Sequence, residues 1–131
     1  MNLNTEGIQE YCQGEVHDFL LSLVRKELRN IPPDFRCRRK DLCQAILDRN
    51  KEIGNRSTMQ DGMNNILQKW ESRRDQFSAL EKLGFVITKG KTHCKIRVNG
   101  FESGHFLSLS LSPSDRREGR NASRDANLVF F

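Results

Sequence analysis

Apolar residues recur at steps of three and four through residues 8–28, which is the spacing of one stripe on an amphipathic helix. The two prolines after Ile31 end this helix, because proline lacks a backbone N–H donor and disfavours helical geometry in the residue before it. A second, shorter helix is predicted for residues 38–50, before a break at Gly54. The residues expected to face the core are Ile8, Tyr11, Cys12, Val16, Phe19, Leu20, Leu23, Val24 and Leu28 in the first helix, and Leu42, Ala45 and Ile46 in the second.

A third periodic segment begins near residues 57–58, and its apolar stripe stays in phase through a charged patch. Two interpretations are open. Either one long helix reaches Leu83, or Ser72 or Asp75 caps a new helix. In both cases the helix ends before Gly84. The stripe residues are expected to belong to the core, namely Met59, Met63, Ile66, Leu67, Trp70, Phe77 and Leu80.

After Gly84 the apolar period changes from that of a helix to that of a strand. Residues 85–88 form a short β-type run, and from Thr92 the chain alternates as far as the turn signal at residues 99–100. A third strand follows from His105. Three sequential strands joined by tight turns predict an antiparallel meander with one face covered by helices. In the middle strand, Cys94, Ile96 and Val98 share one face, and His93, Lys95 and Arg97 share the other. In the third strand, Leu107, Leu109 and Leu111 share one face, and Phe106, Ser108 and Ser110 share the other.

The tail has two interpretations. In one, Ser112 caps a helix with Pro113 at its first position, although Gly119 argues against an uninterrupted helix. In the other, a loop continues through Arg120 and a helix covers residues 121–130.

The predicted fold class is α+β. A helical region, residues 1–70, precedes an α-β-β-β-α unit with a three-stranded antiparallel sheet, residues 71–131. The length of 131 residues fits one domain, or one small domain with a helical appendage.

Charge is concentrated in the last third of the chain. The net charge is +5, and residues 84–131 hold 8 basic and 4 acidic side chains, whereas residues 1–83 hold 14 and 13. An anionic partner is therefore expected near the carboxyl end, although a basic surface also serves solubility.

Composition excludes several other classes of protein. No apolar stretch approaches the roughly 18 residues of a membrane span, and the first nine residues lack the pattern of a signal peptide. The four cysteines are expected to be reduced thiols of a cytoplasmic protein. Their spacing relative to the histidines is looser than that of zinc ligands, so we expect neither a metal site nor a cofactor.

The outward face of the middle strand carries the candidate chemistry. His93 has the side chain that exchanges protons near neutral pH, and Lys95 and Arg97 can stabilise charge on a phosphate. The alternative is an ordinary solvated strand face. Arginines of the tail, Arg116, Arg117, Arg120 and Arg124, also suit phosphate, unless they form a solvated surface paired with nearby carboxylates.

Residues 76–127 resemble the HicA-type toxin family, small bacterial ribonucleases with a fold like that of double-stranded-RNA-binding domains. The resemblance rests on a helix ending Leu80-Glu81-Lys82-Leu83-Gly84-Phe85, a short strand, and Gly90-Lys91-Thr92-His93-Cys94-Lys95-Ile96. Thr92, His93, Lys95 and Ile96 fit the motif, whereas the glycine stands one residue early, at Gly90. The resemblance implies that His93 is the catalytic residue.

The sequence therefore predicts a protein that binds RNA, with double-stranded or structured RNA as the expected ligand and with shape and 2′-hydroxyl groups as the features that it recognises. Metal-independent endoribonuclease activity at His93 is the reaction that the resemblance implies. Lys91, Lys95 and Arg97 would hold phosphates, and Arg116, Arg117 and Arg120 would extend this surface.

Two alternatives are open. The first is a non-catalytic nucleic-acid-binding or adaptor subunit of a bacterial phage-defence or toxin–antitoxin system, with the N-terminal helices binding a protein partner or a second copy. The second is a structural helical domain with an incidental basic tail. His105 is expected to be an edge or core histidine rather than a site residue.

Overall fold

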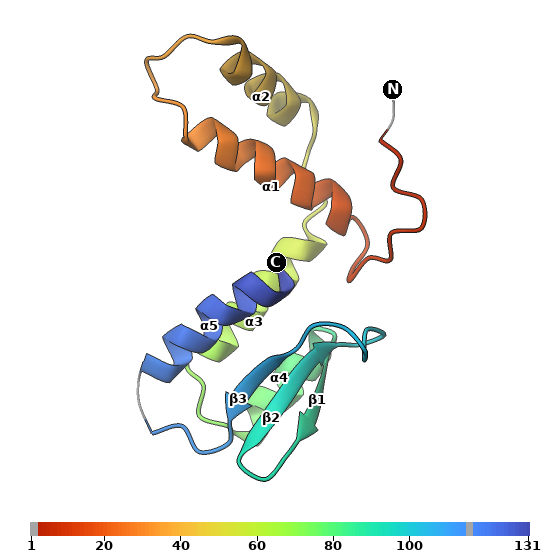
Figure 1. Ribbon diagram of the computed structural model, residues 1–131, viewed down its shortest axis with the longest axis vertical. Helices are drawn as coiled ribbons and strands as arrows, with labels where there is room; N and C mark the ends of the chain where they lie inside the picture. The colour runs from red at the N-terminus through yellow and green to blue at the C-terminus, as the bar shows by residue number, and fades with distance from the viewer. Residues whose placement is uncertain (1–2, 115–116) are drawn as a thin grey trace. The chain divides into compact units, whose positions relative to one another are not determined.

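The computed structural model describes residues 3–114 and 117–131. The chain forms two compact units, Met1–Arg56 (unit 1) and Ser57–Phe131 (unit 2). The predicted α+β class is confirmed, because helices precede a three-stranded antiparallel sheet that is followed by a C-terminal helix (Figure 1). The elements are α1 (Glu15–Arg29), α2 (Arg38–Arg49), α3 (Asn55–Gln68), α4 (Arg74–Lys82), β1 (Phe85–Lys89), β2 (His93–Val98), β3 (Leu107–Ser110) and α5 (Arg117–Phe130).

The boundary between the units differs from the one expected after residue 70. Most of α3 belongs to unit 2, because its buried residues Met59, Met63 and Leu67 contribute to the core of that unit. The apolar stripe of this segment therefore predicted correctly that these residues are buried, but it did not predict to which unit the helix belongs.

In unit 1, α1 begins at Glu15, seven residues later than the apolar stripe predicted. Gly14 precedes the helix with φ of 85°, a left-handed conformation that interrupts helical geometry. The side chain of Glu10 then accepts a hydrogen bond from the backbone N–H of Val16 at 2.8 Å, which satisfies one of the unpaired donors of the first turn. Residues 8–12 therefore lie outside the helix. Within it, Phe19 and Leu23, two residues predicted to face the core, are 40% and 46% exposed, whereas Leu21 is buried.

The buried face of α2 also differs from the prediction. Leu42 and Ile46 are 45% and 41% exposed, and Ala45 is exposed as well, whereas Cys43 is buried and Leu47 half-buried. The helix packs against α1 through the face that carries Cys43. The residues predicted to be buried are therefore offset by one position from those that are.

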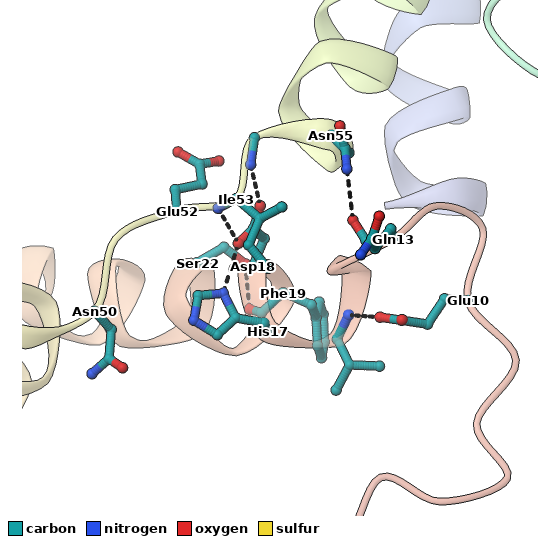
Figure 2. Close-up of polar contacts among 12 residues, drawn as sticks. Glu10, Gln13, His17, Asp18, Phe19, Ser22, Asn50, Glu52, Ile53 and Asn55 are labelled. Carbon is teal, nitrogen blue, oxygen red and sulfur yellow. Dashed lines mark hydrogen bonds and ion pairs between the residues drawn. The ribbon is translucent and has the colours of Figure 1, made fainter.

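Asp18 is a buried polar residue that ties α1 to the segment after α2 (Figure 2). Its carboxylate accepts hydrogen bonds from the backbone N–H groups of Ile53 at 2.9 Å and Gly54 at 2.8 Å, and its Oδ1 lies 2.8 Å from Nδ1 of His17. Burial alone would raise the pKa of Asp18, but these hydrogen bonds and the charge of His17 outweigh it and lower the pKa below 3.8. The ionised carboxylate therefore stabilises unit 1.

Unit 2 is built on the sheet β1-β2-β3, in which each strand is antiparallel to the next. The register pairs Phe85 with Val98 and Cys94 with Leu109. Figure 1 shows α4 behind the sheet, and α4 packs against β1 while α5 contacts β3. Buried residues alternate with more exposed ones along β2 and β3, as the sequence predicted. The core residues of the sheet are Phe85, Cys94, Ile96, Val98, Leu107 and Leu109.

The periodic segment that reaches residue 83 forms two helices, α3 and α4, so the first of the two interpretations, one long helix, is wrong. Ser72 has φ of 60° and breaks the helix, but neither Ser72 nor Asp75 caps α4. The side-chain oxygen of Gln76 instead accepts hydrogen bonds from the backbone N–H groups of Glu71 and Arg73. The indole N–H of Trp70 donates to the backbone oxygen of Ser110 at 3.0 Å, which fixes the turn against β3.

Helix α5 runs antiparallel to α3, and both interpretations of the tail placed its start wrongly. Among the described residues it begins at Arg117, and the buried Gly119 lies inside it. A Cβ atom at Gly119 would lie 2.5 Å from the backbone oxygen of Gln68, so only glycine allows the two helices to come this close. At the other end of the pair, the side chain of Gln60 donates to that of Asn127 at 3.0 Å.

None of the helices in the described ranges is both long and apolar enough to cross a membrane. Within the same ranges no three His, Cys, Asp or Glu side chains come together where they could hold a metal ion.

Candidate nucleic-acid interface

Strand β2 presents its charged residues on the side of the sheet away from the buried core. His93 and Lys95 are exposed and Arg97 is half-buried, while the residues between them are buried. The predicted alternation of this strand is therefore confirmed. The register places Ser110 opposite His93 and Ser108 opposite Lys95, so the β3 neighbours of these two residues are small and polar.

His93 stands at the first position of β2, next to the turn that joins it to β1. Its backbone oxygen accepts a hydrogen bond from the N–H of Gly90 at 2.7 Å, which closes the turn. Its Nδ1 lies 3.0 Å from the hydroxyl oxygen of Thr92, and this contact orients the ring. Nε2 has no hydrogen-bond partner among the described residues and is the ring atom available to a ligand.

A shallow hollow of about 350 Å³ adjoins His93. Its charged lining consists of lysines, with no carboxylate, so it is suited to an anion. Lys89 lies over the ring of Phe77, with its Nζ 4.2 Å from the ring centroid, and Lys91 and Lys95 are the other two cations of the lining. The lining residues are Thr88, Lys89, Gly90, Lys91, Thr92, His93, Lys95 and Ser108.

Phe106 extends this surface, and the sequence did not single it out as a site residue. The residue is 43% exposed and its ring lies against two cations, with 4.8 Å from the ring centroid to Nζ of Lys95 and 4.9 Å to Cζ of Arg97. The pairing of Ile96 with Leu107 places the next residues of the two strands, Arg97 and Phe106, across from each other. Alternation assigned Phe106 to the face opposite the leucines, but its neighbours depend on the register.

The cations of this face have no ionic partners in the described part of the chain. Lys91, Lys95 and Arg97 form no salt bridge with any described carboxylate, and the buried Nε of Arg97 has no hydrogen-bond acceptor there. Uncompensated positive charge favours binding of a polyanion at this face.

The arginines of the tail occupy a different element. Arg117 and Arg120 are exposed near the start of α5 and do not line the hollow beside His93. Arg124 lies 3.4 Å from the carboxylate of Asp125, an exposed ion pair. Arg116 lies outside the described residues. The structure thus brings together Lys91, His93, Lys95 and Arg97, and adds Phe106.

His105 is not part of the sheet. It is exposed in the loop before β3, which begins at Leu107 rather than at residue 105, so the expectation of an edge or core histidine is wrong.

Comparisons of the chain with protein-family models, curated proteins and solved structures found no match.

Proposed function

We propose that unit 2 binds RNA on the exposed face of its sheet and resembles HicA-type toxins in using His93 for metal-independent cleavage. The observation that carries this proposal is the hollow beside His93, which is lined by lysines and contains no carboxylate. Lys95 lines this hollow, and Arg97 lies beyond it on the same face of β2. A phosphodiester is the anion that such a surface fits, and the cytoplasm of a bacterium is the proposed location.

The proposed reaction uses the 2′-hydroxyl of the RNA as its nucleophile. Nε2 of His93 takes the proton of this hydroxyl while the 2′-oxygen bonds to phosphorus. The bond from phosphorus to the 5′-oxygen breaks, and solvent supplies the proton that the leaving oxygen needs. The products are a 2′,3′-cyclic phosphate and a 5′-hydroxyl. Lys91 and Lys95 stabilise the negative charge that grows on the phosphate oxygens.

The binding step predicts a loss of affinity when cations of the hollow are removed. We expect the double variant Lys91→Ala, Lys95→Ala to bind RNA more weakly, with a slope of log affinity against log salt that is smaller by about 1.4, since two phosphate contacts are lost. Gel shifts between low and high salt measure this slope. The matched control is Lys26→Ala, Lys51→Ala, which removes two exposed lysines of unit 1. Equal slopes for both double variants would contradict the assignment of the hollow.

The cleavage step predicts that His93→Ala slows RNA decay by about 100-fold or more, because general acid–base groups contribute about that factor. Decay of total RNA in buffer with excess chelator measures the effect. His105→Ala is the control, since this exposed histidine of the same unit lies outside the hollow. If the His93→Ala protein degrades RNA as fast as the parent, the proton-transfer role of His93 is refuted.

A second candidate function is a non-catalytic adaptor, and the surface of unit 1 favours it. Exposed apolar side chains on α1 and α2, namely Phe19, Leu23, Leu42 and Ile46, suit contact with a protein partner or a second copy of the chain. An adaptor would give a salt-sensitive gel shift without cleavage, so the same assays distinguish the two functions.

A further inference from the structure

Phe106 places an exposed aromatic ring among the cations of the sheet face. We infer that Phe106 stacks against an unpaired base of the bound RNA strand, while Lys95 and Arg97 hold its phosphates. The inference rests on the proposed function, and it goes further because it assigns a base-stacking residue and specifies that the base it contacts is unpaired.

The geometry of the ring supports this role. Phe106 remains 43% exposed although Lys95 and Arg97 lie 4.8 and 4.9 Å from its centroid, so part of the ring surface is open to a ligand. Covering a solvated phenylalanine ring with a flat apolar group lowers the free energy, because apolar surface is removed from water. The two cations beside it attract phosphates, and a nucleotide is the ligand that joins a flat aromatic group to a phosphate.

The partner base must be unpaired for steric reasons. In an RNA duplex each base is stacked between its neighbours, and only the base edges and the backbone are open to a protein. Away from the ends of a duplex, a side chain can stack on the face of a base only in a single strand, a loop or a bulge. A duplex would therefore reach Lys95 and Arg97 through its phosphates but would leave Phe106 without a partner.

The stacking position is close to the proposed cleavage position. Lys95 lies two residues from His93 on the same strand face, a separation of about 7 Å along the strand. Lys95 also contacts the ring of Phe106 and lines the hollow beside His93. A base on Phe106 thus fixes which phosphate of the strand faces His93.

The test compares three RNA ligands of equal phosphate number per strand: a single strand, the blunt duplex of that strand, and a strand of abasic riboses. Fluorescence anisotropy gives the affinity of each for the His93→Ala protein, which keeps the ligand intact, with and without Phe106→Ala. We expect Phe106→Ala to weaken single-strand binding by about 5-fold to 150-fold, the range for loss of one stacked base. Affinities for the duplex and the abasic strand should change by less than about twofold.

Two further variants control for folding and for surface chemistry. Phe106→Tyr keeps a ring that can stack and should retain most of the single-strand affinity. Phe35→Ala removes an exposed phenylalanine of unit 1 and should leave all three affinities unchanged. Retention of single-strand affinity in Phe106→Ala would overturn the inference, as would an equal loss for all three ligands, which would mean that the ring only positions the cations. Failure of the parent to bind any RNA is a different result and refutes the proposed function as well.

Discussion

At the scale of single residues, Asp18 shows how one buried carboxylate can hold a small helical unit together. Its two oxygens accept hydrogen bonds from the N–H groups of Ile53 and Gly54, which precede α3. Removing the acceptor leaves a buried N–H donor unsatisfied, and this costs more free energy than the hydrogen bond contributed. Stability is therefore sensitive to substitution of Asp18. The fold of unit 1 depends on a polar contact as well as on apolar packing.

We expect Asp18→Asn to destabilise unit 1 by about 1–3 kcal/mol, because an amide offers one acceptor oxygen where the carboxylate offers two. Circular dichroism during urea unfolding measures the change. Asp34→Asn is the control, since Asp34 is exposed in the loop before α2. Equal unfolding midpoints for the two variants would show that the hydrogen bonds of Asp18 contribute little.

The same residue gives stability a dependence on pH. The pKa of Asp18 is lowered in the folded state, so its contribution is present above the ordinary value of 3.8 and is lost as the pH falls through the lower folded value. The parent should therefore lose more stability than Asp18→Asn between neutral pH and strongly acidic pH. Parallel stability curves for the two proteins would contradict a lowered pKa.

At the scale of elements, the pairing of α3 with α5 depends on a close approach of two backbones. Gly119 lies against the carbonyl groups of Leu67 and Gln68, where a Cβ atom would be 2.9 and 2.5 Å from the two oxygens. The backbone of α3 cannot move aside as a flexible side chain could. Close packing here also positions β3, which α5 contacts, and thereby supports the sheet face that carries Phe106.

We expect Gly119→Ala to destabilise unit 2 by about 1–3 kcal/mol. Alanine favours a helix over glycine by about 1 kcal/mol, but a clash with a backbone oxygen costs more than this gain. Thermal unfolding followed by the fluorescence of Trp70 measures the result. Asn121→Ala is the matched control, because Asn121 is exposed on the same helix and gains helix propensity without a clash. A Gly119→Ala protein as stable as this control would refute the close approach.

At the scale of the whole molecule, the residues of the proposed RNA surface all come from one of the two units. The sheet, the hollow beside His93 and the ring of Phe106 all belong to unit 2. The core of this unit includes residues of α3, so a fragment that starts at residue 71 would lack Met63 and Leu67, which are almost fully buried.

We expect a fragment of residues 57–131 to fold and to bind RNA with an affinity close to that of the full chain. A fragment of residues 71–131 should be unfolded or aggregated, because it lacks the α3 part of the core. Circular dichroism and gel shifts on both fragments test this. Loss of RNA binding in a folded 57–131 fragment would show that unit 1 contributes to the RNA surface.

The sequence by itself determined the α+β class, the alternation of β2 and the face that carries His93, Lys95 and Arg97. These features follow from local periodicity, because a strand turns successive side chains to opposite faces. Tertiary structure decided the buried face of α2, the start of α1 after Gly14 and the assignment of α3 to unit 2. These depend on which partner each element meets.

The pairing of Phe106 with Lys95 and Arg97 also needed the fold. It follows from the register of two strands that are joined by a loop with no clear pattern, and register is a property of the sheet rather than of either strand. The close approach at Gly119 is of the same kind, since a glycine in a helix signals a contact only when the neighbouring backbone is in place.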